Sequence, residues 1–143
     1  MRKEICILEP NKNCNPSEVY TIFNDVIYEP SEDNINKILS DYATQETKTL
    51  YGYCIDDKLV GIIGVDDGEV FEILHFGIHP SFRNRGYGTE LMDYIRKAYP
   101  GRKLFLTTAD DAVVFYKKYG YSISEFSEEI NGKETKRYKC ELK

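Results

Sequence analysis

The chain has 143 residues, 41% of them hydrophobic and 30% charged, which is the size and composition of one globular domain around a single core. Its formal net charge of −5 provides no basic field that would attract nucleic acid or an acidic membrane surface. The four cysteines are scattered, without a C-x-x-C pair or neighbouring histidines, so their spacing does not indicate a zinc site.

The first ten residues lack an apolar stretch long enough for a signal peptide. The most apolar run, residues 59–65, is far too short to cross a bilayer. We therefore expect a cytoplasmic protein without a membrane partner. No repeat, low-complexity segment or linker divides the sequence, which predicts a single domain over residues 1–143.

The N-terminal part predicts a strand and two amphipathic helices. Residues 4–8 read as a strand, and Asn15 followed by Pro16 is a typical helix start. This helix is expected to continue to about Tyr28, and Ser31 is expected to cap a second one. The apolar stripes of the two helices are Val19, Ile22, Phe23 and Val26, then Ile35, Ile38, Leu39 and Tyr42.

Three strands are expected next, at residues 49–55, 58–65 and 70–78. Short, turn-prone segments join them, so we expect an antiparallel meander. A helix with an apolar stripe at Leu91, Met92, Ile95 and Tyr99 follows, and residues 103–108 read as the next strand. A helix between two strands favours a crossover to a parallel neighbour.

The C-terminal part predicts a last helix at 111–120 and two further strands. Thr108 and Asp111 resemble a capping box for that helix. Strands at 121–130 and 136–142 flank an Asn-Gly dipeptide that is typical of a hairpin turn. The expected fold class is therefore α+β, with a mixed and mostly antiparallel central sheet flanked by helices.

Residues 79–92 place two arginines beside a Gly-x-Gly sequence, directly before a predicted helix. Gly86 and Gly88 remove two Cβ atoms where the backbone turns, and Arg83 and Arg85 add positive charge there. Such a segment suits an anion, most naturally a phosphate. The alternative is a surface loop with solvated arginines. A Rossmann fingerprint or a Walker loop would need further residues that the sequence lacks.

The segment Arg83–Gly88 resembles the R/Q-x-x-G-x-G/A signature of the GCN5-related N-acetyltransferase (GNAT) family. A second family element, aromatic-Tyr-x-x-x-Gly-aromatic, matches residues 115–121 on the last predicted helix. The resemblance implies a three-layer α/β/α fold and transfer of an acetyl or other acyl group from acetyl-CoA to a primary amine. It implies no metal.

The resemblance also implies which residues hold the cofactor. Backbone amides from about Arg85 to Thr89 would point at the coenzyme A diphosphate, at the positive end of a helix. The strand segment 76–78 would lend backbone groups to the pantetheine arm, in a gap between two parallel strands. The candidate cofactor-binding residues are Phe76, Gly77, Ile78, Arg83, Asn84, Arg85, Gly86, Tyr87, Gly88 and Thr89.

Amine attack needs a proton acceptor, because an amine with pKa near 10.4 is neutral in only about one molecule in a few thousand at pH 7. Glu72 stands at the position of the base glutamate in the histone-modifying branch of the family. It could instead be an exposed strand residue. Glu69 is a weaker candidate, alternation places His75 on the opposite face from Glu72, and His79 is expected to be structural.

Tyr116 matches the acid tyrosine of the family. A thiol is a stronger acid than a phenol by more than one pKa unit, so full proton transfer from the phenol to the departing thiolate is uphill. The phenol would therefore first donate a hydrogen bond to the developing charge, and its proton would follow as the thiolate departs. The alternative role of Tyr116 is core packing. Ala109 departs from the family pattern, which often has asparagine there, and this puts one polar contact to the cofactor in doubt.

The sequence leaves the acceptor open between a small amine and a protein amine. Two other functions remain: a non-catalytic acyl-CoA-binding module on the same fold, and an interaction domain whose loop binds nothing. An exposed final strand would allow a homodimer through edge pairing.

Overall fold

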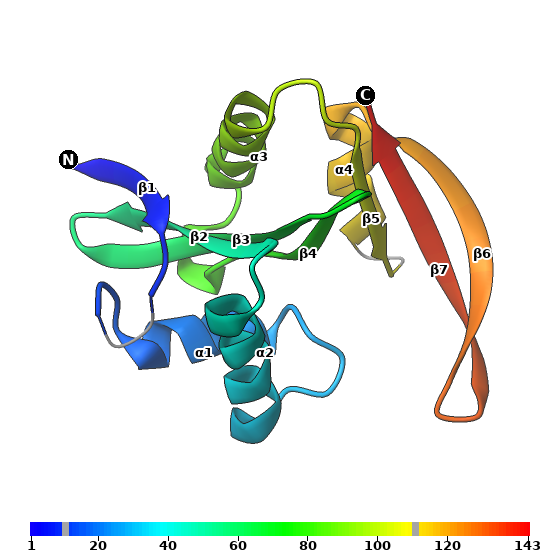
Figure 1. Ribbon diagram of the computed structural model, residues 1–143, viewed down its shortest axis with the longest axis horizontal. Coiled ribbons are helices and arrows are strands. Elements are labelled where there is room, and N and C mark those ends of the chain that lie inside the picture. The colour runs from blue at the N-terminus through cyan, green and yellow to red at the C-terminus, as the bar shows by residue number, and fades with distance from the viewer. Residues whose placement is uncertain (10–11, 110–111) are drawn as a thin grey trace.

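The computed structural model describes residues 1–9, 12–109 and 112–143. They form three layers, with a seven-stranded sheet between two pairs of helices (Figure 1). Helices α1 and α2 lie against one face of the sheet, and α3 and α4 lie on the other. The expected α+β class with its mixed sheet is confirmed. None of the described helices is long and apolar enough to cross a membrane.

The elements follow the predicted order. The strands are β1 (Lys3–Ile7), β2 (Lys48–Ile55), β3 (Lys58–Asp67), β4 (Phe71–Ile78), β5 (Leu104–Thr108), β6 (Ser122–Ile130) and β7 (Lys133–Leu142). The helices are α1 (Pro16–Asn24), α2 (Glu32–Thr44), α3 (Tyr87–Ala98) and α4 (Val113–Tyr119), and a short 3₁₀ turn, η1 (Pro80–Phe82), precedes α3.

The strands lie in the order β1-β2-β3-β4-β5-β7-β6. The first four pair antiparallel, β5 is parallel to β4, and β7 pairs antiparallel with both β5 and β6. The antiparallel meander and the parallel crossover through α3 are therefore both confirmed. The crossover matters for function because it brings the end of β4, the start of α3 and the start of α4 to one place.

Two predicted boundaries were wrong by three residues or more. Helix α1 ends at Asn24 rather than near Tyr28, because the backbone N–H of Asp25 bonds back to Ile22 and Phe23 and closes the helix. Strand β7 begins at residue 133 rather than 136, since the hairpin pairs from its turn outward. Helix α4 is described from Val113; the proposed capping partner Asp111 lies outside the described residues.

Each face of the sheet buries its own core. One core joins α3 and α4 to the sheet, and its buried helical members are Tyr87, Leu91, Met92, Ile95 and Tyr116. The other joins α1 and α2 to the sheet through Val19, Ile22, Phe23 and Ile35. The predicted apolar stripes thus supply both cores, as amphipathic helices packed on a sheet require.

A β-bulge in β4 changes which side chains share a face. His75 pairs with Gly64, but the next pair is Ile73 with Val65, so one residue of β4 is extra. Glu72 pairs with Asp66, which is two residues after Gly64, and β3 alternates regularly between these two positions. Glu72 and His75 therefore lie on the same face. The expectation that they face opposite ways was wrong, because strict alternation does not hold across a bulge.

The hydroxyl of Tyr42 on α2 fills the space above Gly64 and lies 2.6 Å from Nδ1 of His75. A Cβ atom at Gly64 would overlap that hydroxyl. We predict that Gly64→Ala lowers the free energy of unfolding by about 1–3 kcal/mol, because it forces Tyr42 away and leaves the partly buried His75 without its partner. Chemical denaturation measures this.

Gly68→Ala is the matched control for Gly64→Ala. A Cβ atom at Gly68 would meet only the Asp66 carboxylate at 3.3 Å and a backbone oxygen at 4.0 Å. We expect a change of about 0.5 kcal/mol or less there. Equal losses in the two variants would contradict the role given to Tyr42.

Candidate functional site

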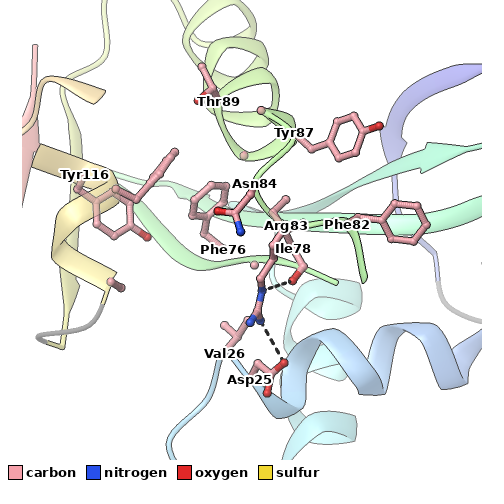
Figure 2. Close-up of a pocket in the computed structure, with 15 residues that line it drawn as sticks. Asp25, Val26, Phe76, Ile78, Phe82, Arg83, Asn84, Tyr87, Thr89 and Tyr116 are labelled. Carbon is pink, nitrogen blue, oxygen red and sulfur yellow. Dashed lines mark hydrogen bonds and ion pairs between the residues drawn. The ribbon is translucent and has the colours of Figure 1, made fainter. Parts of the chain in front are cut away.

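A pocket of about 680 Å³ opens where β4, the loop before α3 and the start of α4 meet (Figure 2). Strands β4 and β5, both described in full, pair at one register position, Glu72 with Phe105, and diverge beyond it (Figure 1). The pocket lies on the open side of this divergence. Its lining consists of Asp25, Val26, Phe76, Gly77, Ile78, Phe82, Arg83, Asn84, Gly86, Tyr87, Gly88, Thr89, Ala112, Phe115 and Tyr116.

The N-terminus of α3 supplies the polar wall of the pocket. Gly86 is the N-cap residue and has a φ of +83°, a conformation that favours glycine, while Asn84 has a φ of +63°. Among the described residues, no side chain caps this helix. The amides at the start of α3, Tyr87 to Thr89, precede the first intrahelical bond donated by Glu90. They form a positive helix end that faces the pocket.

Gly88 provides the room in front of that helix end. A Cβ atom there would lie 3.2 Å from Cζ of Phe76 and 3.6 Å from Cζ of Phe115. The rings of these two phenylalanines are 5.2 Å apart, so they form an apolar wall beside the helix start. The glycine keeps this part of the pocket open between polar and apolar walls.

Tyr116 closes the pocket on the α4 side (Figure 2). Its ring is 6% exposed and packs 6.1 Å from the ring of Phe76 and 5.4 Å from that of Tyr121. Burial, with a smaller effect of Cys140, raises the pKa of its hydroxyl above the usual value. The phenol therefore stays protonated at neutral pH and can donate a hydrogen bond into the pocket.

The two arginines of the loop have different surroundings. Arg83 donates from Nε to the carbonyl of Ile78 at 3.1 Å and from Nη2 to Asp25 at 3.1 Å (Figure 2). Arg85 does not line the pocket; its guanidinium lies 5.5 Å from the ring centre of Phe82. Arg83 is therefore held at the pocket wall by its bonds to the Ile78 carbonyl and the Asp25 carboxylate.

Glu72 lies outside the pocket lining, on the face of β4 that α1 and α2 cover further along the strand. It is half-buried, and its pKa is raised chiefly by burial and then by Asp66, against the opposing effect of Lys48. The neighbouring His75 is more enclosed, and burial together with Lys48 lowers its pKa to about 4. His75 is therefore neutral at pH 7 and hydrogen-bonded to Tyr42.

The structure brings together all the candidate cofactor-binding residues except Arg85, and adds Tyr116. It also adds lining residues that the sequence did not indicate: Asp25 and Val26 from the end of α1, Phe82 and Ala112. No motif marks the end of α1 as part of a site 50 or more residues away in sequence. Ala109 is exposed and outside the pocket lining, and its neighbour Asp110 lies outside the described residues.

The pocket fits a ligand with an anionic end and an apolar arm. The uncapped start of α3 suits a phosphate or diphosphate, and Gly88 allows its backbone to approach. Beyond it, Phe76, Gly77 and Ile78 offer strand backbone that β5 does not pair. Coenzyme A combines these two features.

Comparison with known proteins gives the same picture. Residues 14–142 match the profile of the acetyltransferase (GNAT) domain. The chain is 31% identical over 81 residues to an uncharacterized N-acetyltransferase of the lysA 3′ region of Bacillus methanolicus, which covers 52% of this chain and 67% of that protein.

Solved structures share the architecture. A GNAT family acetyltransferase from Elizabethkingia anophelis with acetyl-CoA bound superimposes with a TM-score of 0.68 at 19% identity, over 99% of this chain and 97% of the other. An aminoglycoside 6′-N-acetyltransferase complexed with coenzyme A gives a TM-score of 0.75 at 19% identity, over 96% and 95%. At these identities the likeness establishes the fold.

Proposed function

The chain belongs to the GNAT acetyltransferase family, and on this premise we propose that it transfers an acetyl group from acetyl-CoA to a primary amine in a ternary complex. The observation that carries the proposal is the uncapped start of α3 facing a pocket that Tyr116 closes. Solved relatives with acetyl-CoA or coenzyme A bound support the choice of co-substrate.

In the proposed complex the backbone amides of residues 87–89 hold the diphosphate, and Gly86 and Gly88 provide the conformation and the room for it. Strand segment 76–78 lies along the pantetheine arm and turns the thioester toward Tyr116. These contacts orient the co-substrate and take no part in bond making. Their contribution is proximity of the thioester to the amine.

The chemistry is one nucleophilic acyl transfer. The nitrogen of the neutral amine forms a bond to the thioester carbonyl carbon, the carbon–sulfur bond breaks, the thiolate leaves, and the nitrogen loses one proton to solvent to give the neutral amide. Tyr116 donates a hydrogen bond to the developing negative charge on sulfur and then its proton, which solvent later replaces. The raised pKa of Tyr116 keeps that proton available across the neutral pH range.

Glu72 is proposed as the base that takes the proton of the ammonium form, through water because it stands outside the pocket lining. Burial and the neighbouring Asp66 raise its pKa, which makes the carboxylate a better proton acceptor than an ordinary glutamate. His75 is neutral at pH 7 but already hydrogen-bonded to Tyr42, which favours a structural role for it.

We predict that Glu72→Gln lowers kcat about tenfold at pH 7, since the variant must wait for the rare neutral amine. Activity of the unaltered protein falls as pH drops through the raised pKa of Glu72, where the carboxylate becomes protonated. In the variant the rate instead follows the fraction of neutral amine and rises with pH up to the pKa of the amine, so the deficit of the variant shrinks toward that pH. A pH–rate profile of both proteins measures these effects.

Glu69→Gln is the matched control, because Glu69 is an exposed carboxylate at the preceding turn. Its profile should superimpose on that of the unaltered protein. A plateau in the rate of Glu72→Gln well below the pKa of the amine would show that another group accepts the proton.

The deciding experiment has two stages. Calorimetry first measures binding of coenzyme A, and a thiol assay then measures amine-dependent release of coenzyme A from acetyl-CoA. The amine panel contains spermidine, an aminoglycoside and peptides with free N-terminal or lysine amines. Binding without release would favour a non-catalytic acyl-CoA-binding module, and failure to bind would contradict both functions.

A further inference from the structure

Arg83 joins two elements that are distant in sequence. Its guanidinium donates to the carbonyl of Ile78 at the end of β4 and to the carboxylate of Asp25 at the end of α1, each at 3.1 Å. Both side chains are about half exposed, 49% for Arg83 and 47% for Asp25. The resemblance assigned this arginine to the diphosphate, whereas here it connects the two walls of the pocket (Figure 2).

The end of α1 needs such a cation. Asp25 is the C-cap residue of α1, and the last turn of this fully described helix carries no basic residue. A carboxylate at the negative end of a helix is unfavourable unless a positive group compensates it. Arg83 supplies that group from 58 positions away in sequence.

Val26, the residue after Asp25, packs this end of α1 against the sheet. Val26 packs directly over Gly77 of β4, where a Cβ atom would overlap Cγ2 of Val26 and approach Cγ2 of Ile22 to 3.3 Å. Charge and packing thus fix the same two residues, Asp25 and Val26, and both line the pocket.

The other end of this segment reaches the hairpin. Nδ2 of Asn131, in the β6–β7 turn, donates to the carboxylate of Glu29 at 3.2 Å, and the Glu29 carbonyl accepts from Asn34 at 2.8 Å. Residues 25–29, here called the wall segment, therefore run from the pocket to the hairpin tip. Figure 2 shows Asp25 and Val26 on the side of the pocket away from Thr89 of α3.

We propose that Arg83 is a positioning residue: it holds the wall segment against β4, and the wall segment places the acceptor amine. This inference rests on the proposed acetyl transfer. The start of α3 occupies the phosphate side of the pocket, so the amine approaches from a side bordered by the wall segment. Loosening that border weakens acceptor binding and leaves the chemical step and the diphosphate contacts in place.

Two variants test the pair, Asp25→Asn and Arg83→Gln, together with their combination. With the fastest amine of the panel, each single variant should raise the KM for the amine about three- to fivefold, the range of a partly exposed ion pair. The kcat should stay within about twofold, and the double variant should be no worse than either single one. Arg83→Lys should also raise the KM for the amine, because an ammonium group lacks the planar guanidinium geometry that donates to both the Ile78 carbonyl and the Asp25 carboxylate.

Asp33→Asn, in the first turn of α2, removes the same charge away from the pocket and should leave KM unchanged. Additive effects of the two single variants would overturn the proposal. A weaker affinity for coenzyme A in Arg83→Gln, with the KM for the amine unchanged, would overturn it too and would make Arg83 a diphosphate ligand.

A measurement without substrates separates this inference from the proposed function. Amide hydrogen exchange of the wall segment should become about three- to fivefold faster in both single variants and not in Asp33→Asn. If no amine supports turnover, the proposed function fails, while faster exchange still supports the role of the Arg83–Asp25 ion pair in holding the wall segment. Unchanged exchange overturns the proposal that this ion pair holds the wall segment, whatever the activity.

Discussion

Replacing Tyr116 by phenylalanine is expected to lower kcat about a hundredfold while leaving the affinity for coenzyme A within about twofold. The ring remains, so its packing against Phe76 and Tyr121 is kept, and only the hydroxyl that we propose faces the departing sulfur is lost. Removing one preorganised donor to a developing negative charge typically has an effect of this size. Steady-state kinetics and calorimetry on the same preparation measure the two quantities.

The pH dependence adds a second expectation for Tyr116. Burial raises the pKa of its hydroxyl, so the phenol remains protonated, and active, at least up to the usual pKa of tyrosine near 10. Rates of the unaltered protein should therefore show no fall from Tyr116 ionisation below that pH. Tyr121→Phe is the matched control. The hydroxyl of Tyr121 is buried outside the pocket lining, where it donates a hydrogen bond to Sδ of Met92 at 3.1 Å. Equal losses in the two variants would assign Tyr116 to packing alone.

Gly88→Val is expected to weaken coenzyme A binding about 10- to 100-fold. A Cβ atom at this position is already 3.2 Å from Phe76, and the two methyl groups of valine would enter the space in front of the helix start. Overpacking of this kind typically costs about 1–3 kcal/mol, and each 1.4 kcal/mol is tenfold in affinity. Calorimetric titration with coenzyme A gives the dissociation constant directly.

Gly101→Ala separates binding from folding in this test. Gly101 has a φ of +80°, so alanine is strained there, but it lies outside the pocket lining and a Cβ atom would meet nothing within 4 Å. The variant should lose stability of about 1 kcal/mol and keep its affinity for coenzyme A. Unaltered binding by Gly88→Val would place the cofactor elsewhere.

Local signals in the sequence predicted the elements well. Asn15 and Pro16 mark the start of α1, and in the structure the Asn15 side chain accepts from the amide of Ser17. The Asn-Gly dipeptide lies at the tip of the final hairpin, with positive φ at both residues. Such features depend on residues within one turn of each other, so pattern and propensity are sufficient to find them.

Features that depend on distant partners could not be predicted in this way. The bulge in β4 is visible only once Gly64 and Val65 are paired with it, and it reverses the relation between Glu72 and His75. The ion pair of Arg83 with Asp25 joins residues 58 positions apart. The motif indicated where an anion would bind, and the wall opposite to it came from a helix end without any motif.

The interrupted pairing of β4 and β5 has a mechanical consequence. It divides the sheet into two groups of strands, β1–β4 and β5–β7–β6, here called plates, which meet at the single pairing of β4 with β5. On the α3 face one core spans both plates, whereas the core beneath α1 and α2 contains only residues before β4 among those described. The two plates are therefore held together by one strand pairing and by the core on the α3 face, and among the described residues the core beneath α1 and α2 adds nothing to this connection.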